Sequence, residues 1–248
     1  MREDLYVTIL DTKYCPFRYV GCNEADTEVC DWKCKRCDGM NYLMSLSNLP
    51  KKYRRHQDLD YDLLTDGTTV KYLQYMAYNI EYFVKNAFNV YFYGDTGTGK
   101  TSWAVKMLTN YFSAICDRNG HNVSGLFISV PQLLRDIKYY MTNTNEDFLE
   151  LIESIKTADL VVWDDILQTS QTAFESQWVY SFINDRLMNC KSNIYTSNVT
   201  PDELKSSDAR LHSRVCTESD CLLFSCNDLR GSKKYSQAIL QTEKESND

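Results

Sequence analysis

The sequence lacks any run of eighteen or more apolar residues, the length that a membrane-spanning helix requires. Its first residues, Met1 to Asp4, also lack the charged and apolar blocks of a secretory signal peptide. We therefore expect a cytoplasmic protein that has no membrane partner.

An excess of basic residues is also lacking, since 27 lysines and arginines stand against 34 aspartates and glutamates, for a net charge of -7 at pH 7. This balance argues against a protein that coats nucleic acid by bulk electrostatics, although it leaves a local basic patch open. One expected helix interleaves basic and aromatic side chains that suit the phosphates and bases of single-stranded DNA, and amphipathic packing explains its tyrosines equally well. These candidate DNA contacts are Arg135, Lys138, Tyr139 and Tyr140.

The 248 residues suffice for one main domain with a small appended module, and 43% hydrophobic and 25% charged residues are typical of a folded chain. Changes in composition predict four parts. They are a cysteine-rich module at 1–48, a linker at 49–69, the main domain at 70–231 and a polar flexible tail at 232–248.

Five of the ten cysteines fall between Cys15 and Cys37, and in a reducing cytosol such a cluster indicates metal ligands. Cys34 and Cys37 have the C-x-x-C spacing that presents two thiolates to one tetrahedral Zn²⁺. Cys15 and Cys22 form a second pair, in which Cys30 could replace either residue. The spacing of Cys30, Cys34 and Cys37 also fits the iron–sulfur signature of radical SAM enzymes, but that signature opens a barrel-sized catalytic domain, which does not follow here.

The main domain alternates short apolar runs with segments of helical periodicity, which predicts an α/β fold with a parallel sheet covered by helices in three layers. Strands are expected at 89–93, 126–130, 160–163, 193–196 and 221–224. Helices are expected at 72–84, 101–111, 131–141, 174–187 and from Pro201.

Between the first expected strand and the next helix, the sequence GDTGTGKT matches the phosphate-binding motif G-x-x-x-x-G-K-[ST]. Its glycines let backbone N–H groups surround phosphate oxygens, and the helix adds its positive N-terminal end. We expect Lys100 to reach the β and γ phosphates and the Thr101 hydroxyl to bind Mg²⁺. The expected ATP contacts are Gly94, Asp95, Thr96, Gly97, Thr98, Gly99, Lys100, Thr101 and Ser102.

Two carboxylates follow the buried strand expected at 160–163. Asp164 is expected to organise Mg²⁺, and Asp165 to polarise the attacking water as general base. The two motifs in this order predict an ATP-hydrolysing P-loop enzyme.

From Leu49 to Gly231 the sequence resembles the bacterial and phage helicase loaders of the DnaC and DnaI type and their relative IstB, all AAA+ ATPases. Besides the two motifs above, five segments carry the resemblance: LPKKY at 49–53, FINDR at 182–186, IYTSN at 194–198, ARLHSRV at 209–215 and NDLR at 227–230. The resemblance implies an AAA+ fold whose helical lid is absent or vestigial.

By the same resemblance, Asn198 is the sensor residue that orients water near the γ phosphate, and Arg214 is the arginine finger that completes a neighbouring subunit's site. Arg230 resembles the second sensor arginine, which contacts nucleotide. Activity would then require a homo-oligomer in the ATP-bound state. The resemblance also implies that the zinc module docks on a replicative DNA helicase.

The expected function is therefore ATP-dependent loading of a replicative helicase in DNA replication, with ATP binding and hydrolysis controlling assembly on helicase and single-stranded DNA in a bacterial or phage-infected cytosol. One alternative is an IstB-like transposition or DNA-remodelling ATPase. Another is a binding module that uses ATP as an assembly switch with little hydrolysis. A small-molecule kinase could use the same phosphate loop, but the sensor residue Asn198 and the arginines Arg214 and Arg230 argue against a kinase.

Overall fold

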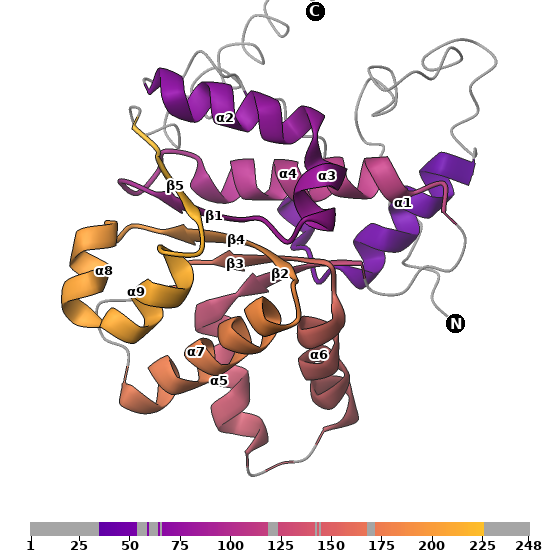
Figure 1. Ribbon diagram of the computed structural model, residues 1–248. Helices are drawn as coiled ribbons and strands as arrows, with labels where there is room; N and C mark the ends of the chain where they lie inside the picture. Colours follow the sequence, from indigo (N-terminus) through magenta and orange to yellow (C-terminus); the bar gives the residue numbers. More distant parts are fainter. Residues whose placement is uncertain are drawn as a thin grey trace, which may run out of the picture.

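The structure, a computed structural model, describes residues 35–53, 59, 64, 66–118, 124–141, 143, 145–167 and 172–225. Within these residues, five parallel strands form one sheet in the spatial order β2-β3-β4-β1-β5 (Figure 1). The strands are β1 (Asn89–Tyr93), β2 (Gly125–Ser129), β3 (Leu160–Asp164), β4 (Ser192–Ser197) and β5 (Asp220–Leu223). Helices lie on both sides of this sheet, so the expected three-layer α/β fold is confirmed.

Two groups of helices cover the two faces of the sheet. One face packs against α1 (Lys35–Leu46), α2 (Gly67–Tyr78), α3 (Ile80–Lys85) and α4 (Lys100–Ile115). The other packs against α5 (Val130–Tyr140), α6 (Glu146–Thr157), α7 (Ala173–Met188), α8 (Pro201–Ser207) and α9 (Ala209–Val215). A short 3-10 helix, η3 (Lys51–Tyr53), follows α1.

Each central strand contributes to both cores, because successive residues of a strand point to opposite faces. In β1, Val90 and Phe92 lie in the core with α1 to α4, whereas Tyr91 lies in the core with α5 to α9. All three side chains are fully buried. A parallel strand that is buried on both faces is a continuous apolar run, and for this reason β1 lies where the sequence predicts it.

The helix expected at 72–84 is divided into two. Asp66 starts α2 earlier than expected, because its side chain accepts a hydrogen bond from the Thr68 backbone N–H at 3.0 Å. Asn79, whose φ of -111° and ψ of 28° are not helical, ends α2, and α3 begins at Ile80. The Thr69 hydroxyl donates to the Leu223 carbonyl at 2.9 Å, so α2 is tied to β5.

Helix α1 lies inside the stretch 1–48 that composition assigns to a separate module. Its apolar side chains, such as Met40 and Leu43, are buried in the same core as α4. Gly39 permits this close packing, because a Cβ there would clash with the Cys116 carbonyl. Just after α1, Ser47 accepts a hydrogen bond from the β2 backbone at 2.8 Å. Residues 35–48 therefore pack as part of the main domain, and the boundary expected at 48 does not separate them from it.

None of the described helices is long and apolar enough to cross a bilayer. The tail expected at 232–248 and the segment NDLR at 227–230 lie outside the described residues. So does any lid that follows β5, since the described residues end at Ser225.

Candidate nucleotide-binding site

The phosphate-binding loop connects β1 to α4 at the carboxyl edge of the sheet. Three of its glycines have positive φ angles, 136° at Gly94 and 91° at Gly97 and Gly99, a region that residues with a Cβ avoid. Gly94 is required for a second reason, because a Cβ there would clash with the backbone carbonyl of Phe224, just beyond β5. The loop conformation thus depends on the glycines of the motif.

Lys100 is the first residue of α4, and its side chain folds back over the loop. Only 6% of it is exposed, and its Nζ donates to the carbonyls of Gly94 at 2.8 Å and Asp95 at 2.7 Å. Within the described residues, no side chain caps α4, whose N-cap is the left-handed Gly99. An ammonium group and a helix N-terminus that faces the loop together form a site for phosphate oxygens. Of the other expected ATP contacts, Thr96 and Thr98 lie in the loop and Ser102 lies in the first turn of α4.

Asp164 ends β3 beside this loop, and two hydroxyls donate to its Oδ1. Thr101 Oγ1 lies 2.7 Å away and Thr196 Oγ1 lies 2.8 Å away. Burial raises the pKa of the Asp164 carboxyl, and the two hydrogen bonds oppose that shift. A carboxylate and a threonine hydroxyl are the hard oxygen ligands that suit Mg²⁺, so Asp164 and Thr101 fit the ion that the motif implies. When bound there, Mg²⁺ would neutralise charge on the phosphates.

Asp165 follows directly and is held in an unusual backbone conformation. It is exposed, with a φ of 52°, which is uncommon for a residue with a side chain. Thr196 stabilises this turn with two hydrogen bonds, one to its side-chain hydroxyl and one to its backbone carbonyl. Its hydroxyl accepts the Asp165 backbone N–H at 3.1 Å, and its carbonyl accepts the Ile166 N–H at 3.0 Å.

Thr196 belongs to the segment IYTSN that carries the family resemblance, but the sequence assigns it no role at the site, although it contacts both aspartates. The signal lies in the order of the strands. Because β4 lies between β1 and β3, its carboxyl end faces both the phosphate loop and the two carboxylates. In this strand order, the polar residue Thr196 near the carboxyl end of β4 lies next to Asp164.

Asn198 lies one residue beyond β4 and is exposed. In the register of the sheet, Ser197 is opposite Tyr93, the residue before Gly94. Asn198 is therefore at the same edge as the phosphate loop and the two aspartates, as a sensor of the γ phosphate requires.

Arg214 lies at the opposite edge of the sheet. It is part of α9, its Nε donates to Asn184 Oδ1 at 2.9 Å, and it lines a small cavity with Asn89 and Lys191, at the amino ends of β1 and β4. The structure does not bring Arg214 to the phosphate loop of its own chain. Arg230 lies outside the described residues.

Of the expected zinc ligands, Cys15, Cys22, Cys34 and the alternative Cys30 lie outside the described residues. Cys37 is described, and its side chain is buried in the apolar core around α1. No group of three or more histidine, cysteine, aspartate or glutamate side chains in the described part of the chain could hold a metal ion.

The candidate DNA contacts on α5 have different environments. Tyr140 stacks on Phe148 of α6, with ring centroids 4.8 Å apart, which is the packing role left open by the sequence. Lys138 is paired with Glu175 at 2.8 Å. Arg135 and Tyr139 are exposed, and Arg135 donates to Gln132 at 2.7 Å.

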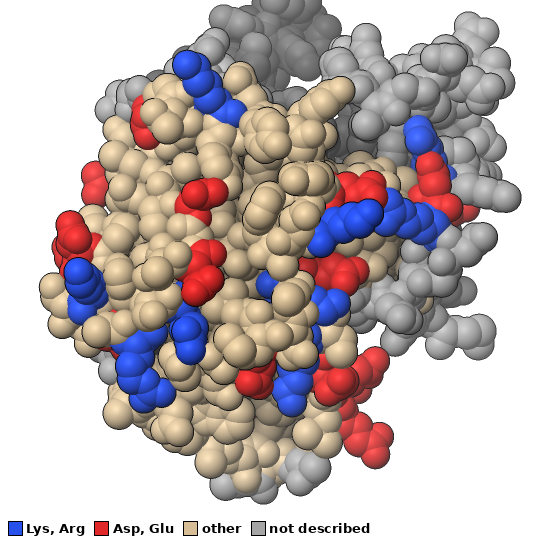
Figure 2. Space-filling model, in the orientation of Figure 1, with Lys and Arg blue, Asp and Glu red and all other residues tan. Residues whose placement is uncertain are grey.

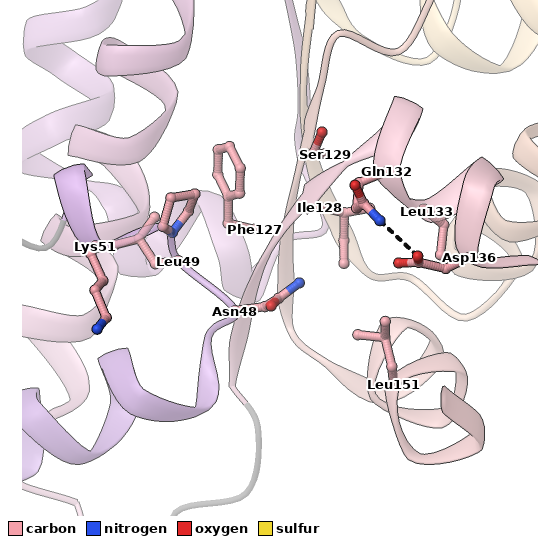
Figure 3. Close-up of a pocket in the computed structure, with 11 residues that line it drawn as sticks. Asn48, Leu49, Lys51, Phe127, Ile128, Ser129, Gln132, Leu133, Asp136 and Leu151 are labelled. Atoms are coloured by element: carbon pink, nitrogen blue, oxygen red, sulfur yellow. Dashed lines mark hydrogen bonds between the residues drawn. The ribbon is translucent and has the colours of Figure 1, made fainter. Parts of the chain in front are cut away.

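A cavity of about 380 Å³ lies beside the edge strand β2, between the segment after α1 and helix α5 (Figure 3). Leu49 and Phe127 line it on one side, and Gln132 donates to Asp136 at 2.7 Å on the other. It includes neither the phosphate loop nor the two aspartates, so it is separate from the candidate nucleotide site.

Solved structures with a similar fold include replication proteins. The DnaC helicase loader is 17% identical with a TM-score of 0.53, over 71% of this chain and 100% of that chain. DnaI is 21% identical with a TM-score of 0.57, over 72% of this chain and 96% of that chain. The replication initiator DnaA, bound to AMPPCP and single-stranded DNA, is 17% identical with a TM-score of 0.53, over 72% of this chain and 51% of that chain. At these identities the likeness shows the fold alone.

A comparison with curated proteins finds no match to this sequence. The family of IstB-like ATP binding proteins, by contrast, matches residues 29–227, which include the phosphate loop, both aspartates, Asn198 and Arg214. This match agrees with the resemblance to IstB that the sequence motifs indicate, and with the three-layer α/β fold. The chain is an AAA+ P-loop ATPase and belongs to the family of IstB-like ATP binding proteins.

Proposed function

We propose that this chain is an ATP-dependent loader of a replicative DNA helicase, which assembles into a homo-oligomer on helicase and single-stranded DNA when ATP is bound and releases them on hydrolysis. The family match and the fold shared with the DnaC helicase loader and DnaI support this proposal. Asp165 acts as the general base, Asn198 orients the attacking water, and Thr101 and Asp164 hold Mg²⁺.

The observation that carries the assembly step is the distance between Arg214 and the phosphate loop. Strand β1 has five residues, and at about 3.3 Å per residue the two edges of the sheet are about 16 Å apart. An arginine side chain cannot span that length, so Arg214 can serve a γ phosphate only in a neighbouring subunit. A single chain is then an incomplete ATPase, and assembly controls hydrolysis.

Mixing two inactive variants tests this arrangement. Arg214→Ala should bind ATP normally and lose about three orders of magnitude in turnover, as expected when a transition-state arginine is removed. Lys100→Ala should fail to bind ATP tightly. In a mixture, an interface between the intact Arg214 of one variant and the intact Lys100 of the other holds one complete site, so activity should partly return. A mixture that stays inactive although mixed oligomers form would contradict a role in trans.

The partner is tested with a purified replicative helicase from a candidate host. The variant Asp165→Asn should bind ATP and not hydrolyse it. In the presence of ATP, we expect this variant to elute together with the helicase in size-exclusion chromatography. No complex under these conditions would favour the IstB-like transposition or DNA-remodelling alternative, which the family match also suits. Turnover that stays negligible with and without single-stranded DNA would favour the ATP-switched binding module.

We also propose that a zinc module formed by the N-terminal cysteines docks on the helicase. The five cysteines between 15 and 37 support it. Because Cys37 is buried in the core of the main domain, its replacement would also disturb packing, and a sharper test replaces Cys15 and Cys22 with serine. We expect this double variant to lose bound zinc and helicase affinity while keeping ATP binding. Zinc content equal to that of the unchanged protein would remove both cysteines from the ligand set.

A further inference from the structure

Helices α2 and α3 expose an unusual number of aromatic side chains next to β5. Tyr75 is 61% exposed, Tyr82 is 54% exposed and Phe88, just before β1, is 45% exposed. In Figure 2 the surface over α2 and α3 is a broad area with few charged side chains. Exposed aromatic surface of this kind marks interaction sites, because tyrosine and phenylalanine gain much from burial against a partner.

These rings border a cavity of about 160 Å³. Met76 and Phe83, both almost fully buried, also line it. The rings of Tyr82 and Phe88 are 6.0 Å apart in an edge-on arrangement, and Phe83 and Phe88 are similarly placed at 5.9 Å. These ring contacts therefore fix the positions of Tyr82, Phe83 and Phe88 in the free protein.

One carboxylate lines the same cavity. Asp220, the first residue of β5, accepts a hydrogen bond from Tyr72 Oη at 2.7 Å, which joins β5 to α2. No lysine or arginine is among the described residues that line this cavity. A pocket with aromatic walls and a carboxylate favours a cation, which gains from the ring faces and the negative charge together. The same charge disfavours the phosphates of nucleic acid.

We propose that this pocket, defined by Tyr72, Tyr75, Tyr82, Phe88 and Asp220, is a docking site for an arginine or lysine side chain of a partner protein. Its volume suits one such side chain and no larger group. The pocket is therefore one anchor point of a wider interface, since arginine and tyrosine are enriched among the few residues that supply most of the binding energy of protein complexes.

This pocket is separate from the nucleotide site, and the inference does not depend on the proposed function. Asp220 begins β5 and Phe88 precedes β1, so the pocket lies at the amino edge of the sheet. The phosphate loop lies at the carboxyl edge. Replacements in the pocket should leave ATP binding unchanged.

The test uses three capped tripeptides, Gly-Arg-Gly, Gly-Lys-Gly and Gly-citrulline-Gly, titrated into the full chain and followed by NMR. Citrulline has the shape of arginine without its charge. We expect the arginine peptide to shift the signals of Tyr75, Tyr82 and Phe88 in a saturable way, and the citrulline peptide to bind at least about tenfold more weakly. Equal binding of the two peptides would overturn the proposal.

Variants locate the binding and supply controls. Asp220→Asn keeps an acceptor for Tyr72 and removes the charge, so it should weaken arginine binding by about five- to tenfold, as should Tyr75→Ala. Tyr78→Ala is the matched control, because Tyr78 is 90% exposed on the same helix and does not line the pocket. A loss in Tyr78→Ala equal to that in Tyr75→Ala would overturn the assignment.

Two other occupants give distinct results. An oligothymidine that shifts the same signals, and loses affinity in Tyr75→Ala, would make this a nucleic-acid surface and refute the protein partner. The chain also has its own cations at Lys233 and Lys234. If replacing both with glutamine increases the affinity of the arginine peptide, the chain itself occupies the pocket, and the proposed partner is wrong.

Discussion

Replacement of Thr196 by valine should disconnect β4 from the two aspartates with almost no change in shape. The substitution removes the hydroxyl that donates to Asp164 Oδ1 at 2.8 Å and accepts the Asp165 N–H at 3.1 Å. One charge-assisted hydrogen bond and one backbone hydrogen bond are lost. Because Asp165 is exposed and Asp164 only half-buried, we expect the lower end of the usual range, about 2 kcal/mol of unfolding free energy.

The effect on catalysis should exceed the effect on stability. Thr196 orients the carboxylate that would organise Mg²⁺, and loss of such an orienting group commonly costs about 10- to 100-fold in metal affinity or activity. Steady-state ATPase measurements at saturating ATP, with free Mg²⁺ varied, should show an activation constant raised by that factor. Urea unfolding without nucleotide measures the stability.

Thr196→Ser provides the control, since it keeps the hydroxyl and loses one methyl group. It should behave nearly as the unchanged protein in its Mg²⁺ dependence. If Thr196→Val and Thr196→Ser give the same activation constant, the hydroxyl does not position Asp164, and the account of this edge of the sheet is refuted.

Three further predictions test other parts of the molecule. Burial raises the pKa of Asp164, so the folded chain holds this proton to higher pH than the unfolded chain, and stability falls as pH rises through that window. Asp164→Asn should therefore raise the Tm of the nucleotide-free protein at neutral pH in calorimetry, and this gain should shrink at acidic pH. The same variant should lose Mg²⁺-dependent hydrolysis. A Tm gain that does not change with pH would contradict the reasoning. Gly94→Ala should lower the free energy of unfolding by about 1–3 kcal/mol and weaken ATP binding, because Gly94 has a positive φ and an added Cβ would clash with Phe224. The control Gly67→Ala has open space around the added Cβ, so it should be neutral or stabilising in thermal unfolding. Arg186→Met leaves three buried carbonyls without their donor and should cost about 2–4 kcal/mol in urea unfolding, and an unchanged midpoint would show that these bonds contribute nothing net.

The central sheet follows from the sequence because its strands are buried on both faces. The expected strands at 89–93, 160–163 and 193–196 agree with β1, β3 and β4 to within one residue at each end. The phosphate loop and the two aspartates are then fixed at one edge, because parallel strands put their carboxyl ends together. The relation of Thr196 to Asp164 needs the order of the strands, which no local pattern contains.

Helices α1 and α6 are harder to predict from the sequence, for different reasons. In α1 the cysteines suggested metal binding and obscured the spacing of Met40, Leu43 and Met44, which is that of a buried helix face. In α6 only Ile155 is fully buried, and several acidic residues alternate with the apolar ones. A short helix at the periphery gives too weak a pattern, because few of its residues must be apolar.

Arg186 shows most clearly what a local pattern cannot contain. In the sequence it belongs to a helix segment that resembles a family motif, and an arginine on a helix is most often exposed. In the structure it is fully buried, and its guanidinium donates to Asn193 Oδ1 at 2.7 Å and to the carbonyls of Ile155, Ala158 and Ser192 at 2.6 to 2.8 Å. Burial lowers its pKa to about 10, which still leaves it charged at neutral pH. The acceptors come from α6, from the turn before β3 and from the start of β4, so the need for an arginine exists only once these elements have packed around it.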